Sequence, residues 1–227
     1  MDLYDEPRNT PASYYEVVVL KEKDRNSFIQ QVKQKAFGYM EQLTGWCSIN
    51  KASIMIDLVF MLEPKTIVEI GVFGGKSLVP MAVALEAIGK GNIFGIDPWN
   101  SFESADGMEG VHLEWWGNLD HEKIMRDLQI KVVEFALLNQ IFLIKTTSEL
   151  APTISNIDIL HIDGNHSEKA SYFDVNKWVP LVRKGGVIIF DDLDWPSNAS
   201  AVRWLDENCT RFIELHEYNE WGIWIKS

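Results

Sequence analysis

The chain has 227 residues, a formal net charge of −12 at pH 7, and the apolar and charged fractions of an ordinary globular protein with a full core. The acidic balance disfavours a nucleic-acid backbone or an anionic membrane surface as the main partner, and no apolar run is long enough to span a bilayer. The polar start MDLYDEPRNT has no signal-peptide pattern, and Cys47 and Cys209 lack metal-ligand spacing, so we expect a cytoplasmic protein with reduced thiols.

The first sixty or so residues predict helices that are added to a main domain. Lys23 to Met40 can be helical, and Ser48 can cap a second helix that ends before Glu63-Pro64. We therefore expect an N-terminal helical addition, residues 1–63, packed on a single compact domain formed by residues 64–227.

From residue 66 onward, strand patterns alternate with helical ones. The expected strands are 66–70, 93–96, 141–144, 157–162, 187–190, 211–216 and 222–225. Helices are expected at 77–88, at 122–138 with Asp120 as its cap, between Asp163 and Gly185, and at 198–208. The segment from Asn100 to Gly117 has the composition of a mobile loop or lid. This order predicts an α/β fold, a Rossmann-like doubly wound sheet of seven mostly parallel strands, with an antiparallel strand from a closing hairpin near Asn219.

A glycine-rich turn, VEIGVFGGKS, joins the first of these strands to the following helix. Gly71 allows a tight turn and close approach of a ligand, while Gly74 and Gly75 keep side chains out of the way. The exposed amides of the turn favour an anionic group. Such turns are common where a helix merely packs on a sheet, so the turn needs support from a second feature.

That second feature is Asp97, at the end of the second strand. An acidic residue at this place can accept hydrogen bonds from both ribose hydroxyls of an adenosine ligand. Dinucleotide-binding proteins share this arrangement, but their turn usually reads GxGxxG, whereas Val72 and Phe73 follow Gly71 here. Glu69 would also lie unfavourably against a pyrophosphate, so a ligand with an ammonium group fits better.

Three carboxylates follow the fourth and fifth strands: Asp163, and then the pair Asp191 and Asp192. A right-handed crossover makes these strands parallel, and the carboxyl ends of parallel strands share one edge of the sheet. Crowded carboxylates repel one another, so a hard cation or a shared proton is expected between them. The structural alternative is helix capping. His166 lies beside the three as a base, a further metal ligand or a structural donor, and His161 is expected to be buried and satisfied.

These motifs, in this order and spacing, resemble class I S-adenosylmethionine-dependent methyltransferases. More narrowly, the chain is similar to metal-dependent O-methyltransferases of the macrocin and catechol group from about Ile67 to its C-terminus. The resemblance implies that Glu69, Gly71 and Ser77 surround the methionine part of the cofactor, with Asp97 on the ribose. It places Ser148 at the adenine. We add Phe73, Trp99 and Asp163 as cofactor contacts. Trp99, Trp115 and Trp116 could border the acceptor or the adenine pocket, or equally pack on the core.

The resemblance also implies metal ligands and a base. Asp163, Asp191 and Asp192 match the metal motifs, and Mg²⁺ or Mn²⁺ is the expected ion. Catechol-type enzymes have a lysine base three residues after the first metal aspartate, where this chain has His166. This departure argues against catechol and favours the macrocin-type enzymes, which modify sugar hydroxyls.

We therefore expect methyl transfer from S-adenosylmethionine to a hydroxyl of a small molecule, with His166 as the base. The expected partners are that acceptor and a homo-oligomer, with no nucleic acid or membrane. Two alternatives stay open: an NAD(P)-dependent oxidoreductase, which requires a pyrophosphate-type turn, and a non-catalytic cofactor-binding protein of the same fold.

Overall fold

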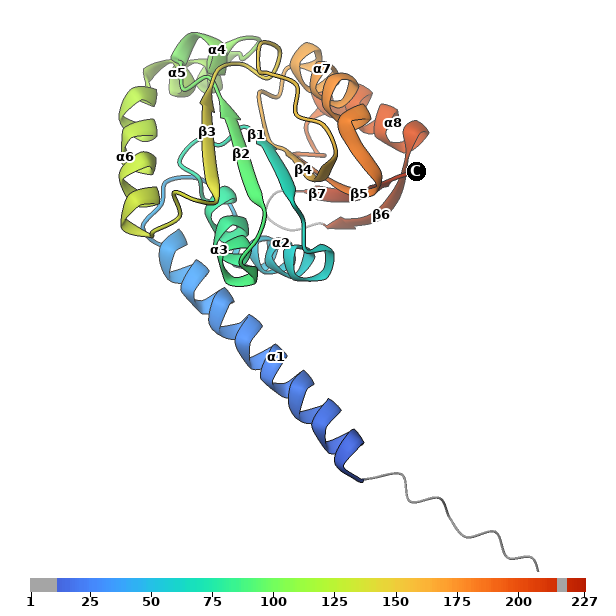
Figure 1. Ribbon diagram of the computed structural model, residues 1–227. Coiled ribbons are helices and arrows are strands. Elements are labelled where there is room, and N and C mark those ends of the chain that lie inside the picture. The colour runs from blue at the N-terminus through green and yellow to red at the C-terminus, as the bar shows by residue number, and fades with distance from the viewer. Residues whose placement is uncertain (1–11, 216–219) are drawn as a thin grey trace, which may run out of the picture.

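The computed structural model describes residues 12–215 and 220–227, and its centre is a single seven-stranded sheet (Figure 1). The strand order is β3-β2-β1-β4-β5-β7-β6. The strands are β1 (Thr66–Ile70), β2 (Asn92–Asp97), β3 (Ile141–Lys145), β4 (Ile157–Ile162), β5 (Val182–Asp191), β6 (Cys209–Leu215) and β7 (Trp221–Lys226). The first five strands are parallel to one another, and β7 is antiparallel to both β5 and β6. The predicted fold class is confirmed.

Helices cover both faces of the sheet. They are α1 (Ala12–Met40), α2 (Ile49–Leu62), α3 (Leu78–Ile88), α4 (Ser101–Ala105), α5 (Gly110–Asn118), α6 (His121–Glu134), α7 (Glu168–Trp178) and α8 (Ala199–Asn208). Two short 3₁₀ helices, Val179–Leu181 and Pro196–Asn198, precede β5 and α8. Side chains of α2, α3 and α6 share one core cluster with one face of the sheet, and α7 and α8 share a second cluster with the other. Successive strand residues supply opposite faces, as the alternation of Ile67 and Val68 between the clusters shows.

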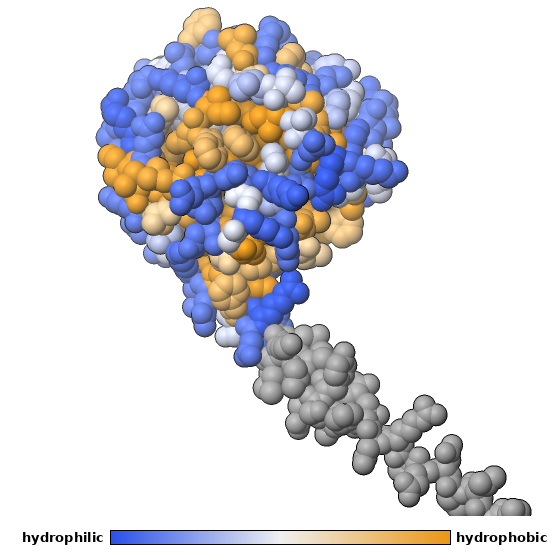
Figure 2. All heavy atoms as spheres, viewed as in Figure 1, coloured by the Kyte–Doolittle hydropathy of each residue, from blue (hydrophilic) through white to orange (hydrophobic). Residues whose placement is uncertain are grey.

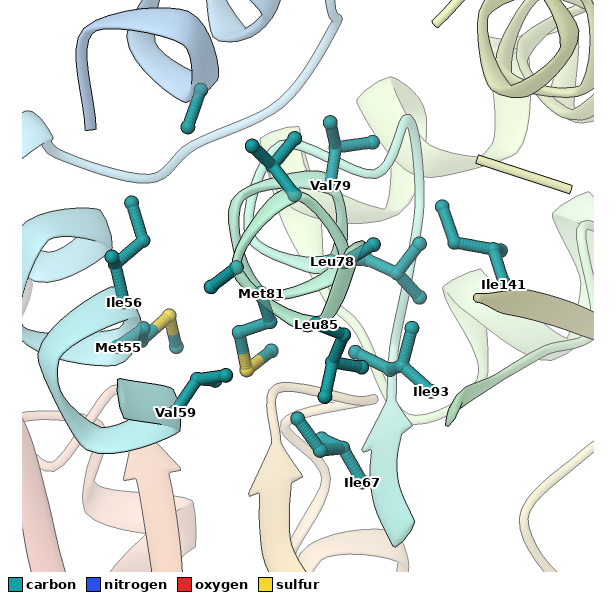
Figure 3. Packing of buried hydrophobic residues seen from close by; sticks show 14 of the residues in the cluster. Met55, Ile56, Val59, Ile67, Leu78, Val79, Met81, Leu85, Ile93 and Ile141 are labelled. Carbon is teal, nitrogen blue, oxygen red and sulfur yellow. The ribbon is translucent and has the colours of Figure 1, made fainter. Parts of the chain in front are cut away.

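The N-terminal helices pack on α3 rather than on the sheet edge. Met55 and Val59 of α2 lie against Met81 of α3, above Ile67 of β1 (Figure 3). Ser48 caps α2, because its hydroxyl accepts a 3.0 Å hydrogen bond from the amide of Lys51, as predicted. Helix α1 begins at Ala12 rather than at the expected Lys23, and Figure 1 shows its first turns projecting away from the body of the protein.

The segment expected to be a loop, 100–117, is largely helical, so that prediction is wrong. Asn100 is the reason, because its side chain accepts hydrogen bonds from the amides of Phe102 and Glu103 and caps α4. Asp120 caps α6 as predicted, with a 2.8 Å bond from the amide of Lys123. The expected turn near Asn219 and the expected last strand residue, His216, lie outside the described residues.

The surface shows where the helices leave the sheet open. Figure 2 shows apolar residues gathered in the middle of the face that Figure 1 presents, where β2 and β3 lie. There Phe94 and Phe142 stack with ring centroids 5.3 Å apart, and Phe142 stays half-exposed. Among the described residues, no helix is long and apolar enough to cross a membrane.

Candidate active site

A cavity of about 280 Å³ opens at the carboxyl ends of the parallel strands. Seven of the predicted site residues line it: Gly71, Ser77, Asp97, Ser148, Asp163, His166 and Asp192. They come from the ends of β1, β2, β3, β4 and β5, which is where open α/β sheets bind ligands. The sheet topology therefore brings residues more than a hundred positions apart into one cavity.

The glycine turn after β1 is shaped by contacts with the protein itself. Gly71 has a φ of +83°, and a Cβ on it would lie 1.9 Å from the carbonyl oxygen of Asp163. A Cβ on Gly74 would lie 2.2 Å from the carbonyl oxygen of Thr44, and one on Gly75 would meet Leu128. Gly74 and Gly75 do keep side chains out of the way, and the space they leave is filled by the protein itself. These glycines let the turn approach α6 and the segment after α1.

Asp97 holds this turn in place. Its Oδ2 accepts hydrogen bonds from the amides of Val72 and Phe73, both at 2.9 Å, and its Oδ1 accepts one at 2.7 Å from Trp99. A carboxylate has about four acceptor positions, so roughly one is left for a ligand. Burial raises the pKa of Asp97, although the three amides oppose the shift. The contact of Asp97 with the ribose stays a prediction. The free acceptor position would suffice for one ribose hydroxyl rather than for two.

Beneath the cavity lies a buried polar layer that contributes no residue to the cavity lining. Glu69 is fully buried, and its Oε1 accepts a 2.7 Å hydrogen bond from the hydroxyl of Ser77. His161, also fully buried, lies 3.4 Å from Glu69 Oε2 through Nδ1 and 3.4 Å from Asp191 Oδ2 through Nε2. His161 is buried as expected, but it is not fully satisfied, because its Nδ1 has no hydrogen-bond partner among the described residues. Glu69 is not among the lining residues, so its predicted cofactor contact would have to act through Ser77.

Lys51 is the principal residue that the sequence analysis missed. It reaches from α2 into this layer, where its buried ammonium pairs with Oδ2 of Asp191. Burial opposes the charge of Asp191, but Lys51 and then His161 hold the pKa of that carboxyl well below its usual range. The signal in the sequence was a single basic residue on the apolar stripe of α2, beside Ala52 and Met55.

Asp163, Asp192 and His166 face the cavity. We call these three residues, together with Asp191, the carboxylate wall. Ligand atoms of Asp163, His166 and Asp192 all lie within 4.8 Å of one another. Nε2 of His166 is 3.0 Å from Oδ2 of Asp192. Burial and then Asp191 raise the pKa of Asp192 to about 7 and that of Asp163 well above its usual value. Burial lowers the pKa of His166 to about 4, so its imidazole is neutral at neutral pH.

This donor set fits a divalent cation. Asp163, His166 and Asp192 offer a carboxylate-rich group, which suits Mg²⁺ or Mn²⁺. Oδ1 of Asp191 is buried and accepts no hydrogen bond from the described residues, while its Oδ2 is taken by Lys51 and His161. Without a cation, the crowding of these carboxylates favours their protonated forms, as the raised pKa values of Asp163 and Asp192 indicate. A bound cation would neutralise their negative charge instead.

A cluster of aromatic side chains also borders the cavity, and we call it the aromatic wall. It consists of Trp46, Phe73, Trp115 and Trp116, with ring centroids 4.9 to 6.4 Å apart. Trp46 and Trp115 are about half-exposed, and Trp46 and Trp116 line the cavity. Phe73 belongs to this wall rather than to the cavity lining.

Trp99 has a different place, below the turn. It is buried, and its Nε1 donates a 2.8 Å hydrogen bond to the carbonyl oxygen of Phe73. It does not line the cavity, so of the two readings of Trp99 the geometry supports packing on the core. The two cysteines form no disulfide, and burial raises the pKa of Cys47 to about 12, which keeps it an unreactive thiol.

Residues 68–193, more than half of the chain, match the family model described as a methyltransferase domain. The chain belongs to the methyltransferase family. One curated relative, an uncharacterised protein from Sinorhizobium fredii named y4gI, is 29% identical over 143 residues. That match covers 60% of this chain but only 14% of the much longer relative.

Solved structures share the fold at low sequence identity. The O-methyltransferase TomG from Streptomyces achromogenes, in complex with SAM, is 17% identical with a TM-score of 0.58, and the match covers 88% of this chain and 89% of TomG. An O-methyltransferase from Bacillus cereus in complex with SAH is 16% identical with a TM-score of 0.56, covering 88% and 91%. Cofactor-bound Rv0187 from MTB is 13% identical with a TM-score of 0.62, covering 86% and 89%. These likenesses show the fold.

Proposed function

We propose that the protein is an S-adenosylmethionine-dependent, divalent-metal-dependent O-methyltransferase that acts on a hydroxyl of a sugar or natural-product type acceptor. The observation that carries the proposal is the convergence of Asp163, Asp192 and His166 beside the glycine turn in one cavity. Helix capping does not account for it, because the cap of the following helix, α7, is Ser167.

The cofactor would lie along the ends of β1, β2 and β3. Ser77 faces its methionine part, Asp97 offers one acceptor to its ribose, and Ser148 borders its adenine. Asp163 lines the cavity next to Gly71, so a cofactor bound at the glycine turn would lie close to the carboxylate wall. TomG and the Bacillus cereus enzyme, which share the fold, were solved with SAM and SAH.

The residues of the carboxylate wall would hold the metal and move the proton. Asp163 and Asp192 would be ligands together with Oδ1 of Asp191. A divalent cation supplies Lewis acidity that lowers the pKa of an acceptor hydroxyl and orients it. His166, neutral because of its lowered pKa, would take the hydroxyl proton, and Asp192 at 3.0 Å would stabilise the resulting imidazolium. The acceptor oxygen would then form its bond to the methyl carbon as the carbon–sulfur bond breaks.

The deciding experiment measures methyl transfer to a panel of small hydroxylated acceptors after treatment with EDTA and after adding back Mg²⁺. We expect activity to stop with EDTA and to return with Mg²⁺, and Asp192→Ala to abolish it. Activity that survives chelation would remove the metal from the proposal. Calorimetry that shows binding of NAD and none of S-adenosylmethionine would favour an oxidoreductase, and cofactor binding without turnover of any acceptor would favour a non-catalytic protein.

The kind of partner, the compartment and the oligomeric state are also part of the proposal. The net charge of −12 disfavours a nucleic-acid or membrane partner, so a free small molecule in the cytoplasm is the proposed acceptor. Homo-oligomerisation stays a prediction, which light scattering would test.

A further inference from the structure

Asn165 joins two loops that follow different strands of the sheet. It lies in the loop after β4, and its side-chain Nδ2 donates hydrogen bonds to the carbonyl oxygens of Glu103, Ser104 and Asp106 at 3.2, 3.4 and 2.9 Å. Those carbonyls lie at the end of α4 and just after it, in the segment that follows β2. In the sheet, β1 lies between β2 and β4, so the two loops meet across the end of β1. We call residues 103–107 the strap.

The strap borders the cavity. Residues of the strap line it, as do Asn165 and, between the two loops, Gly71 of the glycine turn. The strap is therefore part of the enclosure of any ligand that lies in the cavity. Helix α4 buries only Ala105, so little apolar packing holds the strap in place. Its position depends instead on its contacts with the loop after β4.

Two further contacts fix the same junction. Oδ1 of Asn165 accepts a 2.8 Å hydrogen bond from the amide of Ser167, the residue that caps α7. Gly107 of the strap has a φ of +73°, and a Cβ built on it would lie 2.7 Å from the Cβ of Ser167. Any other residue at this position would be strained at that φ and would collide with Ser167, so glycine lets the strap approach this closely. The side chain of Asn165 thus ties the strap to the start of α7.

We propose that Asn165 is a latch that sets how fast ligands enter and leave the cavity, an inference that rests on the proposed binding of S-adenosylmethionine there. A segment that encloses a site must open before a ligand can pass. The latch bonds join protein to protein and involve no ligand atom, so they oppose entry and exit alike. Their loss should raise the association and dissociation rate constants by the same factor and leave Kd nearly unchanged. The loss of a residue that contacts the ligand changes Kd instead, mainly through the dissociation rate constant.

The test is stopped-flow binding of S-adenosylhomocysteine, followed by tryptophan fluorescence because Trp46 and Trp116 line the cavity. Asn165→Asp keeps the acceptor oxygen of the side chain, but once ionised it cannot donate to the strap. Both rate constants should rise about tenfold, the ratio expected when one or two ordinary hydrogen bonds are lost. Asn176→Asp is the matched control, because it makes the same change on α7, where the amide donates to the carbonyl oxygen of Tyr172 in the same helix. It should leave both rate constants unchanged.

Gly107→Ala tests the latch from the side of the strap. The added Cβ should push the strap away from Ser167 and raise both rate constants in the same way. Hydrogen exchange gives a readout that needs no ligand. The amides of Ser104 and Met108, each bonded at 3.0 Å to a backbone carbonyl in or beside α4, report on opening of the strap. They should exchange about tenfold faster in Asn165→Asp than in wild type.

The outcomes separate the latch from the proposed function. Wild type that does not bind S-adenosylhomocysteine contradicts the proposed function, and hydrogen exchange still tests the latch. Unchanged exchange in Asn165→Asp overturns the latch. Rate constants equal to those of wild type overturn it too, as does a faster dissociation that is matched by an equal loss of affinity. Thermal unfolding shows whether each variant is folded at the temperature of the measurement, and Gly107→Ala provides the test if Asn165→Asp is not.

Discussion

The two walls of the cavity are built in opposite ways. The carboxylate wall consists of residues at the ends of central parallel strands, and its members are buried or nearly so. The aromatic wall comes from the segment after α1, the glycine turn and α5, a helix that buries none of its residues. Strand ends are held by neighbouring strands on both sides, whereas α5 is held mainly by α4, by ring contacts and by the 3.1 Å contact between His121 Nε2 and the carbonyl oxygen of Trp116. We therefore expect the reactive groups on the more rigid wall and the acceptor against the more adaptable one.

The family match covers the whole carboxylate wall and most of the aromatic wall. It covers residues 68–193, which include Asp163, Asp191, Asp192 and His166. Trp46 lies outside it, as does Lys51, which neutralises Asp191 from α2. The N-terminal helices thus complete both walls: α2 supplies a buried cation to one, and the segment after α1 supplies a ring to the other. The matched part alone would lack both.

The largest expected effect is that of His166→Ala on turnover. Loss of a general base typically lowers the rate by roughly 10²- to 10⁴-fold. Affinities for S-adenosylhomocysteine and for Mg²⁺, measured by calorimetry, should stay near the wild-type values, because proton removal is separate from binding. A parallel loss of metal affinity would make His166 a ligand instead.

His112→Ala is the matched control, because this histidine is exposed on α5 and its ring lies 5.3 Å from Trp195, against 4.7 Å for His166. It should change turnover far less. Near wild-type turnover of His166→Ala would assign His166 a structural role and would break the comparison between the walls.

Lys51→Met should have the next largest effect, on stability. Removing one partner of a buried ion pair costs about 3–5 kcal/mol, because the other charge is left buried and unpaired. Chemical denaturation would measure the loss. Lys35→Met is the control: its pair with Glu86 is exposed, and such pairs contribute about 0–1 kcal/mol. A double variant, Lys51→Met with Asp191→Leu, should recover much of the stability.

The pH dependence of the free energy of unfolding follows from the lowered pKa of Asp191. A carboxyl whose pKa is lowered by folding stabilises the protein above its unfolded pKa, about 3.9, and the stabilisation is lost as the pH falls toward the folded value. The stability difference between wild type and Lys51→Met should therefore narrow on acidification, since protonation of Asp191 relieves the unpaired charge. A difference that stays constant from neutral to acidic pH would contradict this account of the pair.

Asp97→Ala should weaken binding of S-adenosylhomocysteine by about 1.5–3 kcal/mol, the range for a hydrogen bond to a charged group. Part of the loss would come from the turn itself, because the amides of Val72, Phe73 and Trp99 lose their acceptor. Asp97→Asn keeps one acceptor oxygen, so it should lose less. Unchanged affinity in Asp97→Ala, measured by calorimetry, would show that the ribose does not contact this residue.

The contrast between the walls also explains what the sequence could predict. Strands such as Ile157–Ile162 are short β-branched runs that end in carboxylate, and their order follows from the right-handed crossover, so Asp163 and Asp191 could be placed together in advance. The pairing of Lys51 with Asp191 spans 140 positions and depends on how α2 packs on α3, which no local pattern encodes. The glycines Gly107 and Gly110 suggested a loop, although the Asn100 cap starts α4 before them and α5 begins at Gly110 itself.

The smallest expected effect concerns the mobility of the aromatic wall. Helix α4 buries only Ala105 and α5 buries nothing, so the segment 100–118 should open locally at little cost. It contains no lysine or arginine but several glutamates, among them Glu103, Glu109 and Glu114, so a glutamate-specific protease reports on it. If the segment closes over the cofactor, S-adenosylhomocysteine at about ten times its Kd should slow cleavage there roughly tenfold, by mass action on the closed state. The strand ends of the carboxylate wall should resist cleavage with or without ligand, which provides an internal control within the same digest. Equal cleavage rates in both states would mean that the aromatic wall does not move with cofactor binding, and the acceptor would then meet a preformed site on both sides.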